Sequence, residues 1–444
     1  MKTTYVTRRT FIRSASAAAA FMIVPRHVLG QTPPSAKLNI AGIGIGGICK
    51  SNLDALKTEN IVALCDVDHD YAAPVFKKYP NAKIHTDYRE MFDKQKDIDA
   101  VVIATPDHTH AVISMAAIQA GKHVYCQKPL THDVYEARML AKAAKEKKVI
   151  TQMGIQGHSQ EGFRLICEWV QAGAIGEVRE VDAWCSLSYY PWGHASWSSK
   201  WGERPTETMP VPDTLNWDLW LGPAPQREYH RAYHPRTWRC WWDFGNGMMG
   251  DRGAHTFDPV VSALKLGQPT SIEATSCGLT KETHPLGSIV TYKFPARENL
   301  PPVKLTWYAG TRPPRPEELE DDRQMPKEGG SIIKGTRGKI MAGVYGDSPR
   351  LIPEKAMQEF QRPPKTLPRV PDSHEMDWVR ACKTGQPAGA DFSYSGPLTE
   401  ICLLGNIAIR TDSRIEWDSE NMKVTNLPKA NQYVRNKYRQ GWSL

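Results

Sequence analysis

The sequence predicts two α/β domains: a parallel, doubly wound sheet with helices on both faces, followed by an α+β domain with a largely antiparallel sheet. Short apolar strands alternate with amphipathic helices from residue 37 to about residue 154, and a glycine-rich turn joins the first strand to the first helix. After about residue 155 this alternation stops, and strand-like segments follow one another. Alternating strands and helices are typical of a parallel sheet, and successive strands are typical of an antiparallel one.

The elements of the first domain follow from its apolar segments. Each expected strand is a short apolar run, and each expected helix carries apolar residues at helical spacing. The strands are expected at 37–44, 60–68, 99–106, 122–129 and 149–154, and the helices at 47–57, 70–79, 110–121 and 134–148. We therefore place the first domain at residues 36–154 and the second at residues 155–444.

Length and composition indicate a globular protein with two cores. The chain has 444 residues, of which 41% are hydrophobic and 23% charged. Its net charge is +8, and Lys2, Arg8, Arg9, Arg13 and Arg26 contribute much of it without a nearby acidic residue. The small excess that remains, and the lack of a basic cluster with interleaved aromatic residues, argue against nucleic-acid binding.

Residues 1–30 resemble a twin-arginine export signal. The pair Arg8–Arg9 precedes Phe11, a weakly apolar stretch at 14–24 and the polar segment "QTPPS". The apolar stretch is too short to span a membrane as a mature helix, and no later run reaches that length. We expect export to the periplasm, removal of the signal near Gly30 and no stable membrane insertion afterwards. A cytoplasmic protein with a disordered tail, or an uncleaved anchor, is the alternative.

The cysteine pattern predicts buried thiols and no disulfide framework. The chain has nine cysteines but no C-x-x-C motif. Five of them fall inside apolar strand or helix patterns: Cys49, Cys65, Cys126, Cys167 and Cys402. Small buried thiols fit a protein that folds in the reducing cytoplasm before export.

The first turn carries a dinucleotide-binding pattern. Gly42-x-Gly44-x-x-Gly47 follows a strand and opens a helix, and Asp66 ends the second strand. Glycines let the backbone approach a pyrophosphate, and the carboxylate can bind both ribose hydroxyls. Asp66 would repel a 2′-phosphate, so we expect NAD, with NADP the less favoured cofactor. The expected cofactor contacts of this turn are Gly42, Gly44, Ile45, Gly46 and Gly47.

The segment "ATPDHTH" at 104–110 ends another strand, at the edge of the sheet where ligands bind. We expect Thr105, Pro106 and His110 to contact the cofactor. His108 and His110 lack a third ligand nearby, so no metal site is expected.

Several motifs resemble the Gfo/Idh/MocA family, which includes glucose–fructose oxidoreductase and inositol dehydrogenases. They are the glycine turn, "TPDHTHAVISMAAIQAGKHVYCQKPL", "GDRGAHTFD" and "SGPLTEICLLGNIAIRT". The export signal, "NWDLWLGPAP" and "WRCWWDFGNG" resemble an exported subgroup of that family. The resemblance implies a Rossmann domain and a second domain with a large, mostly antiparallel open sheet. That sheet would bind substrate and form the contact of a dimer or tetramer.

The resemblance also implies catalytic residues. In the family, the lysine of a Glu-Lys-Pro motif lies beside the nicotinamide, and here Gln127, Lys128 and Pro129 occupy these positions. Lys128 is retained, but Gln127 lacks the charge that would favour a protonated lysine. The aspartate and histidine of D-x-G-x-H match Asp251 and His255. Gln127 and Lys128 are therefore expected at the cofactor, and Lys128, Asp251 and His255 in catalysis.

Spacing adds a further expectation for the second motif. Asp251, His255 and Asp258 would share one face of a helix, with Asp251 orienting the histidine. Asp258 is equally well explained as a helix cap or a structural partner.

The second domain offers candidate substrate contacts. Nine of the fourteen tryptophans lie between Trp184 and Trp242, and these rings either stack on a sugar or fill a core or subunit contact. The Pro-rich segment at 311–330 is expected to form an irregular surface loop. The expected substrate contacts are Gln156, His158, Trp238, Arg239 and Arg252.

These observations favour an NAD-dependent oxidoreductase that acts on a sugar, polyol or glycoside hydroxyl. Export suggests a tightly bound NAD that is regenerated in place. A redox-neutral glycosidase would use the same residues, and a non-catalytic sugar-binding protein is a further alternative.

Overall fold

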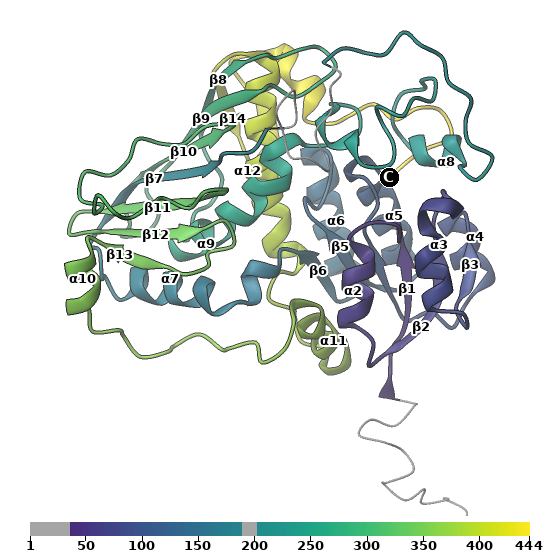
Figure 1. The fold of residues 1–444 in the computed structure, drawn as a ribbon, viewed down its shortest axis with the longest axis horizontal. Helices are drawn as coiled ribbons and strands as arrows, with labels where there is room; N and C mark the ends of the chain where they lie inside the picture. The colour runs from purple at the N-terminus through teal and green to yellow at the C-terminus, as the bar shows by residue number, and fades with distance from the viewer. Residues whose placement is uncertain (1–35, 189–201) are drawn as a thin grey trace, which may run out of the picture.

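The computed structural model describes residues 36–188 and 202–444. Two domains lie side by side, and the chain ends beside α5 and α8 (Figure 1). The predicted export signal at residues 1–30 lies outside the described residues. No helix among the described residues is long and apolar enough to cross a membrane.

The first domain has a parallel sheet, as predicted, with six strands where five were expected. Its strand order is β3-β2-β1-β4-β5-β6, so the order reverses between β1 and β4. Ligands of such sheets bind at this reversal, outside the carboxyl ends of the strands. The strands are β1 (Asn39–Ile43), β2 (Asn60–Cys65), β3 (Lys83–His85), β4 (Ala100–Ile103), β5 (His123–Gln127) and β6 (Thr151–Gly154).

Five helices connect these strands, and capping residues fix where two of them begin. The Asp68 side chain accepts from the backbone of Asp70 and Tyr71 at the start of α3. Asp133 forms a capping box with Glu136 in α6. The short β3 and α4 were not predicted from the sequence. The helices are α2 (Cys49–Ala55), α3 (His69–Lys78), α4 (Tyr88–Lys94), α5 (Asp107–Gln119) and α6 (Val134–Lys147).

The second domain has a nine-stranded sheet in the order β13-β12-β11-β7-β10-β9-β8-β14-β15. Among the described strands of this second sheet, only the pair β7–β10 is parallel, so the prediction of a mostly antiparallel sheet is confirmed. The strands are β7 (Val178–Cys185), β8 (Ser271–Cys277), β9 (Gly287–Phe294), β10 (Val303–Ala309), β11 (Gly329–Gly335), β12 (Lys339–Gly343), β13 (Arg350–Ile352), β14 (Ile415–Asp418) and β15 (Lys423–Val424).

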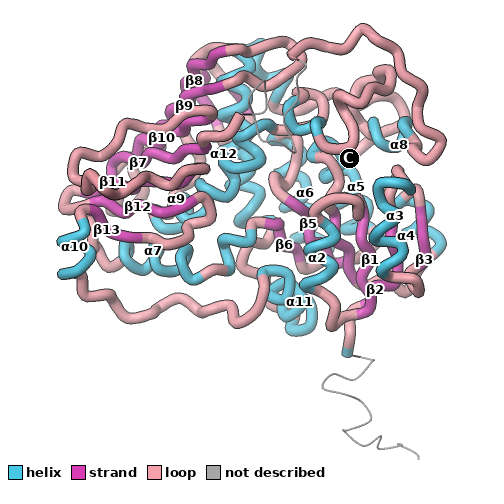
Figure 2. The backbone as a smooth tube through the Cα atoms, viewed as in Figure 1, coloured by secondary structure: helices cyan, strands magenta, loops and turns pink. Residues whose placement is uncertain are grey.

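Of the second domain, α9 and α12 lie between the two sheets, and loops cover much of the outside (Figure 2). The helices are α7 (Glu161–Gln171), α8 (Trp217–Leu221), α9 (Ala254–Ala263), α10 (Glu354–Glu359), α11 (His374–Thr384) and α12 (Phe392–Thr411). A π-helical turn, η4 (Met249–Gly253), leads directly into α9. Short 3-10 turns are η2 (Gln156–Ser159), η3 (Thr237–Cys240) and η5 (Pro428–Tyr433).

The Pro-rich segment at 311–330 is irregular up to β11, as expected, but it is not purely a surface loop. Its Leu319 and Met325 are buried and pack against Trp184 and Met341 of the large sheet. The segment therefore covers part of the sheet.

The cysteines agree with the prediction of buried thiols. All nine are free, and the five singled out from the sequence are buried.

Two helices late in the chain pack against the first domain. In α11, Trp378 packs edge-on against Tyr125 of β5, and Glu375 accepts from Asn52 of α2 at 2.8 Å. In α12, Glu400 is 2% exposed and accepts two hydrogen bonds from Arg138 of α6, at 2.7 and 2.8 Å. The domains are therefore joined by buried contacts that come from the end of the chain.

We expect Arg138→Met to lower the free energy of unfolding by about 3 kcal/mol, because it leaves the Glu400 carboxylate buried without its cation. The matched control is Arg179→Met, whose ion pair with Glu177 is exposed and should contribute less than about 1 kcal/mol. Calorimetric unfolding of both variants would measure the difference. Equal losses in the two variants would contradict a structural role for the buried pair.

Candidate active site

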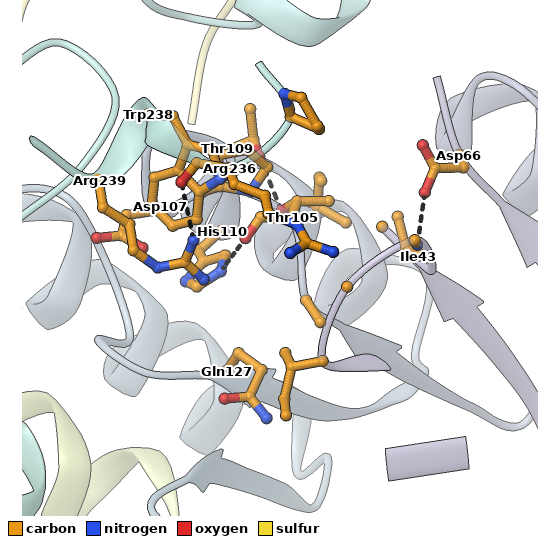
Figure 3. Close-up of a pocket in the computed structure, with 18 of the residues that line it drawn as sticks. Ile43, Asp66, Thr105, Asp107, Thr109, His110, Gln127, Arg236, Trp238 and Arg239 are labelled. Carbon is orange, nitrogen blue, oxygen red and sulfur yellow. Dashed lines mark hydrogen bonds between the residues drawn. The ribbon is translucent and has the colours of Figure 1, made fainter. Parts of the chain in front are cut away.

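One cavity of about 620 Å³ lies where the two domains meet. It opens at the carboxyl ends of the parallel strands and is lined by residues of both domains (Figure 3). Asp66 lies on one side of it, and Asp107 and Arg239 lie on the other. A mostly preformed pocket with a few converging polar groups at this place in the fold is the usual form of a ligand site.

The glycine turn borders the end of the cavity that contains Asp66. Gly44 has a φ of +73°, and a Cβ there would lie 2.6 Å from the side chain of Thr105. A Cβ on Gly46 would overlap the ring of Tyr71. Both positions therefore require glycine, which lets the turn pass close to neighbouring elements and leaves its backbone beside the cavity.

Asp66 is held in place by backbone donors. Its carboxylate accepts from the N–H of Gly46 at 3.1 Å and from the N–H of Asp68 at 3.0 Å. Burial raises the pKa of Asp66, and these two donors offset part of that rise. A carboxylate that lines the cavity in this position suits the two hydroxyls of a ribose.

The structure places most of the predicted site residues around this cavity. On the cofactor side they are Gly44, Gly46, Gly47, Asp66, Thr105, Pro106, His110 and Gln127. Toward the second domain they are Lys128, Gln156, Trp238, Arg239, Asp251, Arg252 and His255.

Three predicted contacts do not line the cavity. Gly42 and Ile45 lie behind the turn, where Ile45 is fully buried and a Cβ on Gly42 would meet it at 3.0 Å. His158 donates through Nδ1 to the Asp258 carboxylate at 2.8 Å, and its ring packs against Phe163. These three residues shape the fold around the site, and we remove them from its direct contacts.

His110 lines the cavity, but its ring nitrogens face two backbone carbonyls. Nδ1 lies 2.8 Å from the oxygen of Pro129, and Nε2 lies 2.9 Å from the oxygen of Thr105. Burial alone would lower the pKa of His110, but Cys126 and the two carbonyl oxygens outweigh it and raise the pKa. The ring therefore ties the loop after β4 to the loop after β5.

Lys128 and Asp251 form an ion pair between the domains. The Lys128 ammonium binds the Asp251 carboxylate and also donates to the Asp251 main-chain oxygen at 3.0 Å. Burial would raise the pKa of Asp251, but Lys128 and Arg239 outweigh it and hold the pKa well below its usual range. Asp251 belongs to the π-helical turn η4, a rare geometry that is frequent at functional sites.

His255 is a buried histidine of the site with a lowered pKa. It is 4% exposed, and burial together with the charge of Lys128 lowers its pKa well below the usual value. Its Nδ1 has no hydrogen-bond partner among the described residues, and its ring packs edge-on against Tyr345. The expected orientation of His255 by Asp251 therefore has no hydrogen bond at Nδ1 to support it. The Asp251 carboxylate holds Lys128 instead.

Asp258 lies outside this group and has the structural role that the sequence left open. It is 1% exposed and accepts from the Tyr394 hydroxyl at 2.6 Å, in addition to its contact with His158. Asp258 therefore does not join Asp251 and His255 at the cavity.

Gln127 occupies the glutamate position of the family motif in a chain of amides. Its Nε2 donates to Asn52 Oδ1 at 3.1 Å, and the Asn52 amide donates to Glu375 Oε1 at 2.8 Å. The nearest carboxylate along this chain thus comes from α11. Nothing in the local sequence pattern indicates that Glu375 would approach this strand.

Asp107 is a site residue that the sequence analysis did not select, although it lies in the "ATPDHTH" segment. Its carboxylate is 5% exposed and accepts from the backbone N–H of Asn246 at 2.9 Å and from the Asn246 amide at 3.2 Å. Burial raises the pKa of Asp107 to about 7, although Arg239 and Lys128 oppose the rise. Tyr345 and Trp442 also line the cavity and carried no sequence signal.

The tryptophans of the second domain mostly fill its core. Trp184, Trp217, Trp241 and Trp242 are buried in hydrophobic clusters, whereas Trp220 and Trp238 line the cavity. The other three from the cluster, Trp192, Trp197 and Trp201, lie outside the described residues.

No group of three metal-binding side chains occurs in the described part of the chain. Both ring nitrogens of His108 face backbone oxygens, those of Phe244 and Trp220, at 3.2 and 2.9 Å. This histidine thus has a structural environment.

Comparisons with known proteins identify the family. The model of the Gfo/Idh/MocA oxidoreductases with an NAD-binding Rossmann fold matches residues 38–155, and the model of their C-terminal α/β domain matches residues 170–288. Together these matches cover more than half of the chain. The chain belongs to the Gfo/Idh/MocA oxidoreductase family, and its first domain is the NAD-binding Rossmann domain of that family.

Curated relatives match over part of their length. The levoglucosan dehydrogenase of Pseudarthrobacter phenanthrenivorans is 31% identical over 124 residues, which are 28% of this chain and 31% of the relative. The inositol 2-dehydrogenase of Serratia proteamaculans is 32% identical over 184 residues, which are 40% of this chain and 51% of the relative. The chain therefore matches about a third of the length of the first relative and about half of the length of the second.

Solved structures share the fold over most of the chain. The WlbA dehydrogenase of Bordetella pertussis, in complex with NADH and UDP-GlcNAcA, has a TM-score of 0.60 and 16% identity, covering 86% of this chain and 99% of that one. A levoglucosan dehydrogenase in complex with NADH and levoglucosan has a TM-score of 0.55 and 17% identity, with coverage of 86% and 99%. At this identity the likeness concerns the fold.

We expect Gly44→Ala to raise the dissociation constant for NAD at least tenfold, because its Cβ would collide with Thr105 and displace the turn. Gly121→Ala is the matched control, since Gly121 has a φ of +71° but nothing within 4 Å of its Cβ position. Both variants carry the strain of a positive φ, and only the first changes the cavity. Titration of each protein with NAD would test this, and equal affinities would contradict it.

Because burial raises the pKa of Asp107, we expect the difference in stability between Asp107→Asn and the natural protein to depend on pH. Its pKa of about 7 in the fold lies above the ordinary value of 3.8, so the folded state keeps this proton longer than the unfolded chain. That contribution to stability is fully present below pH 3.8 and is lost as the pH rises through 7. Asp107→Asn should therefore gain stability relative to the natural protein between pH 4 and 7.5, by at most about 4 kcal/mol. Thermal unfolding across this pH range would measure the difference, with Asp93→Asn, at an exposed position, as the control. A difference between Asp107→Asn and the natural protein that does not change with pH would contradict the raised pKa of Asp107.

Proposed function

We propose that this protein is an NAD-dependent oxidoreductase that acts on a hydroxyl group of a sugar, polyol or glycoside. The observation that carries the proposal is a shared cavity, with the ribose-binding carboxylate Asp66 on one side and Lys128, Asp251 and His255 on the other. The family of the chain and the inositol and levoglucosan dehydrogenases among its relatives support it. A non-catalytic sugar-binding protein would need no such group beside a nucleotide site.

The described residues fit NAD. The backbone of the glycine turn would bind the pyrophosphate, Asp66 would bind the ribose, and the loop at Thr105 and Pro106 would border the cofactor. When bound, NAD would accept a hydride from the carbon that bears the substrate hydroxyl.

Lys128 is arranged to position the substrate oxygen. Its ammonium has three N–H donors, and Asp251 provides two acceptors for it, the carboxylate and the main-chain oxygen. The remaining donor is available to the oxygen of a substrate, where it would stabilise negative charge as the hydroxyl loses its proton.

His255 is suited to receive that proton. Its low pKa keeps the imidazole neutral, so that it has a lone pair to accept the hydroxyl proton. Trp220 and Trp238 border the same cavity and would exclude water from the reacting oxygen.

We further propose that the protein is exported by the twin-arginine route to the periplasm with NAD already bound, and that it regenerates this NAD in place. Contacts of the second domain beside the ribose site support retention. His234 pairs with Asp68 at 2.7 Å, and the N–H of Asn216 donates to the oxygen of Val67 at 2.8 Å. Trp442, near the end of the chain, also lines the cavity. The large sheet would form the contact of a homo-oligomer.

The mature protein, purified without added nucleotide and then denatured, tests retention. Close to one NAD or NADH released per chain is the expected result. Absence of both, with no binding on addition, would contradict both the retained cofactor and the oxidoreductase.

We expect Lys128→Ala and His255→Ala each to lower turnover by about a thousandfold, because each removes a group that handles the substrate proton or oxygen. Bound nucleotide should stay near the level of the natural protein, as the glycine turn and Asp66 are intact. Lys145→Ala, an exposed lysine on α6, serves as the control. Undiminished turnover in both site variants would refute the mechanism. Product analysis separates an oxidised sugar from the hydrolysed product of a redox-neutral glycosidase.

A further inference from the structure

Trp442 brings an aromatic ring of the second domain to the Asp66 end of the cavity. The first domain lines that end with Thr86 and Asp87, which follow β3. The guanidinium of Arg89, at the start of α4, lies 4.9 Å from the centre of the Trp442 ring. The ring therefore lies beside the loop after β3, and Figure 1 shows the end of the chain near α5 and α8.

The adenine of NAD would occupy this end of the cavity. In a doubly wound parallel sheet the pyrophosphate lies at the glycine turn after β1, and the carboxylate at the end of β2 binds the ribose of the adenosine. The base on that ribose then lies beyond Asp66, away from Lys128 and the nicotinamide. Val67 and Tyr88 of the first domain line the cavity there, and the second domain adds Trp442.

The Trp442 ring is held from both domains. Arg89 of the first domain is itself fixed by Asp87, to which it donates at 2.6 and 3.0 Å. Gly222 of the second domain lies so close that a Cβ there would be 3.9 Å from the ring. The ring is only partly buried and lines the cavity, so part of its surface is open to a ligand. A ring that served only the contact between the domains would not need this open surface.

The segment that carries Trp442 is anchored to the start of α6. The N–H of Asn436 donates to Asp133 Oδ2 at 2.8 Å, and the Tyr438 hydroxyl donates to Glu136 Oε1 at 2.5 Å. Asp133 and Glu136 are 1% and 2% exposed. Movement of the segment would therefore take hydrogen-bond donors away from two buried carboxyl groups, which is costly.

A second anchor is Arg439, which binds the end of α8. Its guanidinium donates to the main-chain oxygen of Gly222 at 2.5 Å and to Asp218 Oδ1 at 2.6 Å. Its own N–H donates to the oxygen of Pro223 at 3.1 Å, and its main-chain oxygen accepts from the N–H of Trp442 at 3.2 Å. Trp442 thus follows directly from an anchored residue, which fixes its place at the cavity.

We propose that Trp442 packs against the adenine of NAD, and that the segment 434–442 must leave its anchors before the nucleotide can be released. This inference deepens the proposed retention of NAD and rests on it, but it does not depend on a particular substrate or reaction. Adenine and indole are flat aromatic rings, which pack in offset or edge-to-face arrangements. Because release breaks buried hydrogen bonds as well as this contact, dissociation is slow.

The rate of nucleotide release tests the proposal. Protein loaded with NADH is mixed with an excess of NAD, and the change in NADH fluorescence follows release. Trp442→Ala should release NADH at least tenfold faster than the natural protein, and Trp442→Phe should fall between the two. Leu444→Ala is the matched control, since Leu444 lies two residues further along and packs against the core but does not line the cavity. Equal rates for Trp442→Ala and Leu444→Ala would overturn the proposal.

Competing nucleotides show whether the adenine is the group that Trp442 contacts. ADP-ribose contains the adenine, whereas nicotinamide mononucleotide lacks it. When these compounds displace NADH, Trp442→Ala should weaken ADP-ribose at least tenfold and change the mononucleotide by less than twofold. An equal loss for both would show that the ring supports the domain contact as a whole, and would overturn the proposal. If the mononucleotide does not compete measurably, the loss for ADP-ribose relative to Leu444→Ala decides.

Release and turnover separate this proposal from the proposed function. A Trp442→Ala protein that releases NADH quickly, but oxidises a sugar when NAD is supplied in excess, would support both. Faster release from the variant, with no sugar oxidised by the variant or the natural protein, would refute the function and leave the adenine contact standing. Equal retention by both proteins, with turnover, would refute the adenine contact and leave the function standing.

Discussion

The ion pair between Lys128 and Asp251 is the interaction on which the site depends. Lys128 follows β5 of the first domain, and Asp251 lies in the π-helical turn before α9 of the second. The pair therefore exists only when both domains are docked. It keeps a buried carboxylate ionised, directs the lysine into the cavity, and adds a nearby positive charge that keeps His255 neutral. The packing of the two domains therefore determines the ionisation of Asp251 and His255 in the site.

That docking is maintained by parts of the chain far from the site. The buried contact between Arg138 and Glu400 joins α6 to α12, and the contact between Asn52 and Glu375 joins α2 to α11. Asn246, which precedes the π-helical turn, donates to Asp107 at the start of α5. These contacts fix the first domain against the second from several directions, so that small movements at the cavity would strain buried polar groups.

Much of the first domain could be predicted because its signals are local. The alternation of strands and helices, the glycine turn and Asp66 each follow from a few adjacent residues, and all appear where expected except Gly42 and Ile45, which are packed behind the turn. The short β3 and α4 carry too few apolar residues for a periodic signal. The sequence predicted that the second sheet is mostly antiparallel, but it did not predict the order of the strands. That order depends on long-range pairing, such as the parallel contact of β7 with β10.

The site shows the same limit. Lys128, Asp251 and His255 come from motifs, but their contacts depend on how distant segments meet. His158 looked available to a ligand, yet Asp258 and Tyr394 enclose it, and most described tryptophans of the cluster are core residues. A π-helical turn leaves no mark in residue spacing, and the expected orientation of His255 by Asp251 has no hydrogen bond at Nδ1 to support it.

The replacement of the family glutamate by Gln127 connects these points. A glutamate beside Lys128 would add a negative charge to the strand that carries the lysine, whereas Gln127 passes its hydrogen bond through Asn52 to Glu375. The charge that balances Lys128 must then come from across the domain interface, from Asp251. The neutral residue at position 127 therefore makes the balance of charge at Lys128 depend on the docking of the two domains.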